Sequence, residues 1–176
     1  HFIGSSITAI RRAHGGAAAQ TRRRTTGGTT SARRRPKKAT ALIERQHREV
    51  DSLFESIQAS KANAKLLDQL ASSLTAHAII EEQIFYPVAM KAKKDLVLES
   101  LEEHELMAHA LKRLMACEPK DESFEAKVKT LREIVEEHVQ EEEQEMLPSV
   151  AGSISADEDE ALGKQMETRF DELVHA

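Results

Sequence analysis

The sequence is poor in cysteine and in aromatic residues. It contains one cysteine, Cys117, no tryptophan, and 3% Phe, Trp and Tyr combined. One cysteine cannot form an intramolecular disulfide, and a cysteine-based zinc or iron–sulfur site requires several thiolates. Any bound metal must therefore be held by nitrogen and oxygen ligands.

Long hydrophobic runs are also missing. The apolar runs are a few residues long, whereas a membrane-spanning helix needs about 20 apolar residues. This excludes a protein embedded in the bilayer, and we expect a soluble, cytoplasmic protein. Runs of β-branched residues are scarce as well, while Ala, Leu, Glu, Lys and Gln are abundant, so the composition predicts an all-α fold.

The charge is distributed unevenly along the chain. The 176 residues include 25 Lys and Arg against 30 Asp and Glu, yet residues 1–40 contain ten of the basic residues and no acidic one. We predict that residues 1–38 form a disordered, Arg-rich tail, because this segment offers little to bury and repels itself. Residues 39–176 are long enough for a single domain with a core.

Two interpretations of the tail stay open. Arginine clusters neutralise phosphates, and an Arg-rich start without acids is also typical of organelle-targeting segments, so the tail is a candidate for a weak nucleic-acid contact or an address signal. The alternative is a solvated tail, or a stretch translated upstream of the true start, in line with a first residue that is His1 rather than Met.

Apolar residues recur at helical spacing in five segments, at about 39–60, 62–91, 95–117, 121–147 and from 155 onward. Pro87 is expected to end or kink the second helix, and Pro148 to lie just past the end of the fourth. Asp121 is a candidate N-cap of the fourth helix, and Ser155 begins a capping-box pattern. Short connections predict an up-down-up-down four-helix bundle with an additional C-terminal helix.

Two segments of the sequence repeat one another at an offset of 61 residues. His77, Glu81, Glu82, Gln83 and Pro87 in the first coincide with His138, Glu142, Glu143, Gln144 and Pro148 in the second. Each segment follows a helix with one histidine of its own, His47 or His104. The chain thus consists of two helix pairs, each with His and then His-x-x-x-Glu, a pseudo-twofold pattern.

The spacing within each segment predicts a shared site. Residues four apart on a helix differ by only about 40° in direction, so His77 with Glu81, and His138 with Glu142, can point at one spot. Their neighbours on the same helix faces are apolar, and burying a carboxylate and an imidazole without partners is costly. A metal ion would compensate that cost.

Carboxylate and imidazole groups inside a helical bundle are typical of paired iron or manganese ions. Two bridging glutamates, four histidines and a shared oxo or hydroxo group would leave about two coordination positions open on such a pair. Open positions predict a small ligand such as O₂, NO or peroxide. Zinc stays an alternative to iron, because it accepts the same ligand types.

At these residues the sequence resembles the hemerythrin-like, or HHE cation-binding, family. The resemblance spans about 40–150 and includes Gln46-His47-Arg48, Phe85-Tyr86-Pro87, Glu103-His104 and Glu137-His138 besides the repeat. It implies a four-helix bundle with two non-haem iron ions. It also implies which residues bind the iron ions. The terminal ligands would be His47, His77, His104 and His138, and the bridging carboxylates would be Glu81 and Glu142.

One position departs from the oxygen-carrying hemerythrins, which have a second histidine one turn after the first on the third helix. Here that position is Ala108, and His109 is one residue late, pointing about 140° away from His104. Four histidines and two glutamates are similar to the site of hemerythrin-like iron–sulfur repair proteins. Those usually carry a further cysteine-bearing N-terminal domain, which this sequence does not show.

Several other residues are weaker candidates for the site. Asp51 lies four residues after His47 and is interpreted as a surface acid rather than a ligand, while Glu143 is the fallback if the fourth helix has another register. Tyr86 is expected to pack near the site. Glu82, Glu141 and Glu143 are expected on the solvated face, and Cys117 is expected to be an ordinary thiol.

Two classes of function remain open from the sequence. The first is a di-iron module that binds or senses O₂ or NO, or handles iron under oxidative or nitrosative stress. The second is an enzyme that reduces or disproportionates peroxide or NO, or an iron–sulfur repair-like protein. The first is favoured because the sequence shows no separate acid–base residue, electron-entry cluster or flavin motif. No feature of the sequence indicates the oligomeric state.

Deleting residues 1–38 separates the two interpretations of the tail. If the arginine clusters neutralise phosphates, the full chain binds duplex DNA with an affinity that falls steeply as salt is raised, and the truncated chain loses it. Binding titrations at several salt concentrations measure this. Equal binding by both chains would reject the nucleic-acid interpretation.

Overall fold

The computed structural model describes residues 38–60 and 63–175, and it is entirely helical in its regular structure. The disorder predicted for residues 1–38 falls outside these ranges apart from Lys38. No described helix is both long and apolar enough to cross a membrane. The helical elements are α2 (Ala39–Ser60), α3 (Ala64–Ile80), η2 (Glu81–Phe85), α4 (Tyr86–Ala89), α5 (Lys94–Met115), α6 (Phe124–Glu141), η3 (Glu142–Met146), α7 (Leu147–Ser153) and α8 (Ala156–Val174).

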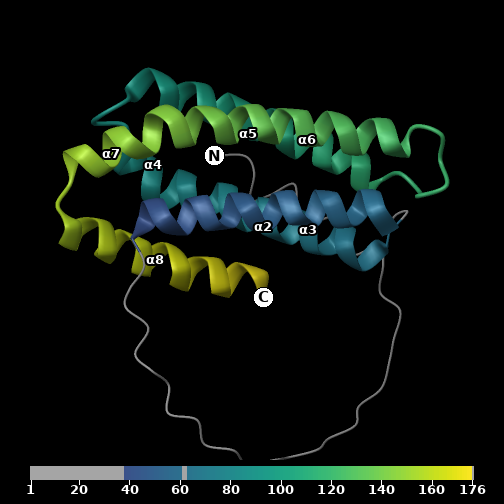
Figure 1. Ribbon diagram of the computed structural model, residues 1–176, viewed down its shortest axis with the longest axis horizontal. Helices are drawn as coiled ribbons and strands as arrows, with labels where there is room; N and C mark the ends of the chain where they lie inside the picture. Colours follow the sequence, from purple (N-terminus) through teal and green to yellow (C-terminus); the bar gives the residue numbers. More distant parts are fainter. Residues whose placement is uncertain (1–37, 61–62, 176) are drawn as a thin grey trace, which may run out of the picture.

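Five longer helices within the described residues form the predicted bundle. Figure 1 shows α2 and α3 as one antiparallel pair and α5 and α6 as a second pair lying along it, with α8 on the outer side of the first pair. Successive helices run in opposite directions. The all-α fold class, with an additional C-terminal helix, is confirmed.

The buried side chains form two apolar clusters, one toward each end of the bundle. On α2 the buried positions recur three or four residues apart, from Leu42 and Ile43 to Phe54 and Ile57, as a helix with one buried face requires. Cluster I consists of Val50, Phe54, Ile57, Leu67, Leu70, Leu74, Met107, Leu111, Leu114, Phe124, Val128, Leu131 and Val135. Cluster II consists of Ala39, Leu42, Ile43, Ile80, Phe85, Tyr86, Ala89, Val97, Met146, Leu147, Val150 and Met166.

Pro87 lies near the end of its helix, which stops at Ala89 as predicted, whereas Pro148 does not end the fourth helix. Each follows a single π-helical turn, in which the backbone N–H of Tyr86 donates to the carbonyl of Glu81 and that of Leu147 donates to the carbonyl of Glu142. A proline ring clashes with the carbonyl four residues earlier in a regular α-helix, and the wider turn relieves this. The fourth helix therefore continues past Pro148 as far as Ser153, so its predicted end was wrong.

The start of the fourth helix also differs from the prediction. Helix α6 begins at Phe124, with Ser123 in the N-cap position, rather than after an N-cap at Asp121. The carboxylate of Asp121 instead accepts hydrogen bonds from the backbone N–H of Glu118 and from the Cys117 thiol. Short polar side chains compete in this way to stabilise turns ahead of helices, so the pattern placed the cap too early.

The C-terminal helix α8 begins with the predicted capping box, and one of its side chains caps the start of helix α2. Ser155 and Glu158 form the reciprocal hydrogen bonds of a capping box at the start of α8. One turn later, the buried carboxylate of Asp159 accepts hydrogen bonds of 3.4 Å from the backbone N–H and the hydroxyl of Thr40, at the start of α2. Helix α8 is thus tied to the bundle by a cap between helices.

We predict that Asp159→Ala lowers the free energy of unfolding by about 1–2 kcal/mol, the usual cost of removing a helix cap. Asp159→Asn keeps an acceptor oxygen and should cost less. Urea unfolding followed by circular dichroism measures both, with the exposed Asp171→Ala on the same helix as control. If the Asp159→Ala and Asp171→Ala variants unfold at the same urea concentration, α8 is not held by this cap.

Candidate metal centre

The structure brings all six predicted ligand residues into one buried layer between cluster I and cluster II. Each helix of the two pairs contributes to it. The contributing residues are His47 on α2, His77 on α3, Glu81 at the start of η2, His104 on α5, His138 on α6 and Glu142 at the start of η3. None of the six is more than 5% exposed, and both glutamates are fully buried.

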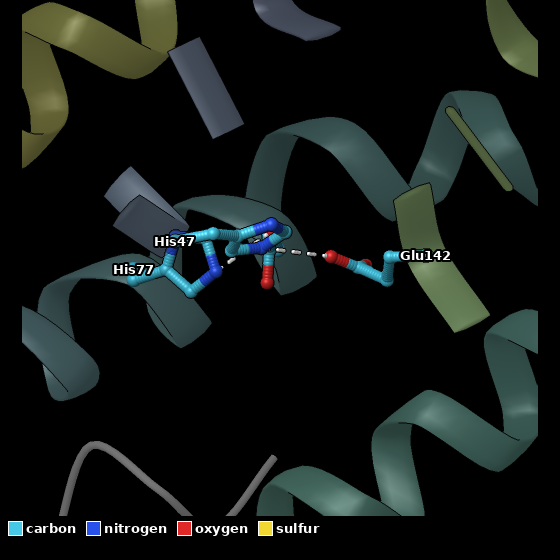
Figure 2. A group of neighbouring side chains, drawn as sticks. His47, His77 and Glu142 are labelled. Carbon is cyan, nitrogen blue, oxygen red and sulfur yellow. Dashed lines mark ion pairs between the residues drawn. The ribbon is translucent and has the colours of Figure 1, made fainter. Parts of the chain in front are cut away.

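The carboxylates of Glu81 and Glu142 lie between the two helix pairs. The two oxygens of Glu81 lie 3.1 Å from Nε2 of His77 and 3.3 Å from Nε2 of His104. One oxygen of Glu142 lies 3.4 Å from Nε2 of His47 and 3.7 Å from Nε2 of His138. Figure 2 shows Glu142 pointing across the bundle toward His47 and His77. Each carboxylate therefore faces a histidine of both pairs.

The other ring nitrogen of every histidine has a partner that sequence reasoning missed. Nδ1 of His47 bonds to Glu143 at 2.9 Å, and Nδ1 of His104 bonds to Glu82 at 3.0 Å. The remaining two bonds run from His77 to the side-chain oxygen of Gln46 at 2.9 Å and from His138 to Glu103 at 2.7 Å. Because each partner oxygen accepts a hydrogen bond from Nδ1–H, the neutral imidazole keeps a lone pair on Nε2.

These outer partners had a signal in the sequence. Gln46 and Glu103 each directly precede a predicted histidine ligand, and Glu82 and Glu143 each directly follow a predicted glutamate ligand. The expectation that Glu82 lies on the solvated face was wrong, because its carboxylate turns inward to His104. Glu143 likewise bonds to His47 rather than facing solvent alone.

The inner atoms of the layer need a cation. Five of them have no hydrogen-bond partner among the described protein groups, namely His47 Nε2, His77 Nε2, Glu81 Oε1, Glu81 Oε2 and Glu142 Oε2. The Nε2 atoms of His104 and His138 lie 3.3 Å apart, and neither can donate to the other while Nδ1 carries the proton. Buried lone pairs that face one another are costly unless a positive ion lies between them.

The layer divides into two candidate cation positions. The first is formed by His47, His77, Glu81 and Glu142, and the second by Glu81, His104 and His138. In each group the donor atoms lie within 4.8 Å of one another. Imidazole nitrogen and carboxylate oxygen together suit iron, manganese or zinc. The residues therefore fit a pair of metal ions that share a carboxylate.

Comparison with known protein families matches residues 38–150 to the family described as Hemerythrin HHE cation binding domain. The chain belongs to this family. The match covers both helix pairs and all six predicted ligand residues, and it confirms the resemblance read from the sequence.

The chain is also similar to individual proteins. A hemerythrin HHE cation binding domain-containing protein from Mycobacterium kansasii has a solved structure that is 26% identical to this chain, with a TM-score of 0.70, and covers 78% of this chain and 88% of that one. An uncharacterized protein of Mycobacterium tuberculosis is 25% identical over 75% of this chain and 84% of its own length. A protein of Nostoc described as a DNA nickase is 29% identical over 68% of this chain, which spans only 35% of that protein.

Tyr86 of the HHE domain lies beside the metal layer, as expected. Its hydroxyl donates a 2.9 Å hydrogen bond to Oε1 of Glu142 and lies 3.3 Å from Nε2 of His104, over whose ring the phenol stacks. Burial and the charge of Glu142 raise the pKa of Tyr86 well above its usual value, so the phenol keeps its proton. In the second half of the repeat, the residue equivalent to Tyr86 is Leu147, which has no hydroxyl group.

The three weaker candidates lie apart from the inner layer. Asp51 is exposed and pairs with Arg132 at 2.6 Å, consistent with a surface acid. His109 is exposed on α5, as its spacing from His104 predicts. Glu143 reaches the layer only through Nδ1 of His47. Cys117 lies at the far end of the bundle, packed against cluster I.

A cavity of about 30 Å³ adjoins the metal layer on the side of cluster I. All four histidines line it, and the opposite wall is mainly apolar. The apolar wall includes Val50, Leu74, Met107, Leu111, Val135 and Val139. A cavity needs about 10–15 Å³ to hold one water molecule, so this one admits a diatomic molecule but not a larger metabolite. Ala108, which replaces the second histidine of oxygen-carrying hemerythrins, is part of its wall.

Within the protein itself, the layer attracts positive charge. Burial, followed by the charge of Glu142, raises the pKa of Glu81 well above its usual value. Burial would also raise the pKa of Glu142, but its electrostatic interaction with His138 and its hydrogen bond to His47 outweigh burial and lower that pKa. Burial lowers the pKa of His47, but the hydrogen bond and charge of Glu142 outweigh burial, so that this pKa is raised. The buried carboxylates thus favour positive charge at His47.

We predict that Glu81→Gln stabilises the metal-free protein and abolishes its metal binding. The raised pKa means that folded Glu81 binds a proton that the unfolded chain has already lost, so its contribution to stability falls as pH rises. The gain from Glu81→Gln should therefore be larger at about pH 8 than at about pH 5.

Chemical unfolding of chelator-treated protein at the two pH values measures this gain. The exposed Glu105→Gln, on α5, removes the same formal charge outside the layer and serves as control. A Glu81→Gln variant that is less stable than the wild type at both pH values would contradict the account of the buried carboxylate.

Proposed function

We propose that this HHE domain is a non-haem di-iron protein that binds or senses a diatomic ligand, O₂ or NO, or handles iron under oxidative or nitrosative stress. One observation supports the proposal above all. Four imidazole lone pairs and two buried carboxylates converge on one layer, and an apolar cavity sized for a diatomic molecule adjoins that layer.

The six inner residues would hold the metal. His47 and His77 would hold one ion, His104 and His138 the other, with Glu81 and Glu142 shared between them. When bound, a pair of iron ions supplies reversible electron transfer to a diatomic gas. The protein fixes the orientations of the four imidazole rings through hydrogen bonds to their Nδ1 atoms. The bonding residues are Gln46, Glu82, Glu103 and Glu143.

The cavity would select the ligand by size and polarity. Apart from the histidines, its wall is apolar except for Thr75, whose hydroxyl already donates to the carbonyl of Ala71. A neutral diatomic molecule therefore loses little solvation on entering. Hydrogen peroxide would leave water hydrogen bonds behind. Apolar packing on both sides of the layer also excludes water from the buried carboxylates.

An enzyme that reduces peroxide or NO is the second candidate, and Tyr86 is the observation that favours it. The phenol holds its proton at the hydroxyl, 2.9 Å from Glu142, and could donate it within the buried layer. The sequence alone had shown no acid–base group besides the expected ligands.

Anaerobic reconstitution with ferrous iron tests both candidates. Iron is counted per chain, and visible spectra are recorded after separate additions of O₂, NO and peroxide. Two irons per chain and a spectrum that reverses on removing the gas support a carrier or sensor. Two irons with steady consumption of peroxide or NO support the enzyme. Less than one iron per chain, unchanged in His77→Ala or Glu142→Ala, would reject a di-iron centre.

We predict that Ala108→Val slows gas binding without removing iron. The added methyl groups intrude on a cavity of about 30 Å³, whereas none of the six metal-holding residues changes. Stopped-flow mixing of the ferrous protein with O₂ or NO should show a lower association rate, with the exposed Ala126→Val on α6 as control. Equal rates in all three proteins would show that the ligand does not use this cavity.

A further inference from the structure

The pseudo-twofold repeat allows the surroundings of the two metal positions to be compared residue by residue. His47 and His104 are equivalent, and their Nδ1 partners Glu143 and Glu82 are equivalent carboxylates. His77 and His138 are equivalent as well. Their partners occupy equivalent places, directly before the first histidine of each pair, but differ in chemistry.

That difference is an amide against a carboxylate. His77 bonds to the neutral side chain of Gln46 at 2.9 Å, while His138 bonds to the anionic side chain of Glu103 at 2.7 Å. The His47–His77 position is therefore supported by one carboxylate and one amide. The His104–His138 position is supported by two carboxylates.

Burial increases the contrast. The side chains of Glu82 and Glu103 are 19% and 17% exposed, whereas that of Glu143 is 36% exposed and better screened by water. A carboxylate that accepts the Nδ1 proton makes the imidazole more basic and strengthens its bond to a metal, and an amide does so less. The interaction is stronger where less water surrounds it.

We propose that the two metal positions are unequal, and that Gln46 and Glu103 are the positioning residues that direct the first ion to His104 and His138. The inference rests on the proposed function, because it requires a centre that holds two ions. The His47–His77 position is then the one that fills second and empties first.

Exchanging the two residues tests the proposal. The variant Gln46→Glu/Glu103→Gln keeps the formal charge and all six inner residues, and only the amide and the carboxylate change places. Crystals of each protein, grown with one equivalent of ferrous iron without oxygen, give the occupancy of each position by anomalous scattering. Calorimetric titration with ferrous iron gives the two dissociation constants.

In the wild type we expect iron mainly at His104 and His138, with dissociation constants that differ by about 10–100-fold, the usual effect of losing such an outer partner. In the exchanged variant we expect the first iron at His47 and His77. Gln46→Glu alone should tighten the second ion and bring the two constants together. Glu99→Gln, an exposed charge one turn before Glu103 on α5, should leave the order unchanged.

Each outcome has a distinct meaning. Equal occupancy in the wild type, or the same order in wild type and exchanged variant, would overturn the inference while leaving a two-ion centre in place. A wild type that binds no iron would overturn the proposed function instead. If the exchanged variant fails to fold by circular dichroism, the single variant Gln46→Glu decides, because unchanged constants there also overturn the inference.

Discussion

The burial of two carboxylates and four imidazoles in the middle of a helical bundle is the constraint on which the rest of this structure depends. Glu81 and Glu142 are fully buried, with three of their four oxygens lacking a hydrogen-bond partner among the described protein groups. Hydrophobic packing cannot compensate that cost directly. It can only hold the groups in place, and clusters I and II do this from either side of the layer.

The π-turns connect this constraint to the backbone. Each begins at one of the two buried glutamates and ends just before the residue that precedes a proline. Single π-turns occur often at functional sites, where the wider turn changes the direction of side chains relative to a regular helix. Here each π-turn begins at a buried glutamate and is followed by a proline, so the repeat in the sequence is also a repeat in backbone geometry.

Much of the fold and of the candidate site could be predicted because both depend on local spacing. Apolar periodicity gave the helices, and the interval of four residues between His77 and Glu81 placed both on one face. The Nδ1 partners lie next to predicted ligands in the sequence, but spacing alone could not show which histidine each one bonds, because the bond between His104 and Glu82 depends on how two helices are rotated against each other. The continuation past Pro148 depends on a π-turn, and helical periodicity carries no signal for one.

Two of the four outer hydrogen bonds cross between the two halves of the repeat. His47 of the first half is oriented by Glu143 of the second, and His104 of the second half is oriented by Glu82 of the first. Neither helix pair alone can present a full set of oriented ligands. If the layer holds metal ions, their retention therefore depends on assembly of the whole bundle. A nascent or damaged chain with one helix pair formed would then hold a metal ion poorly.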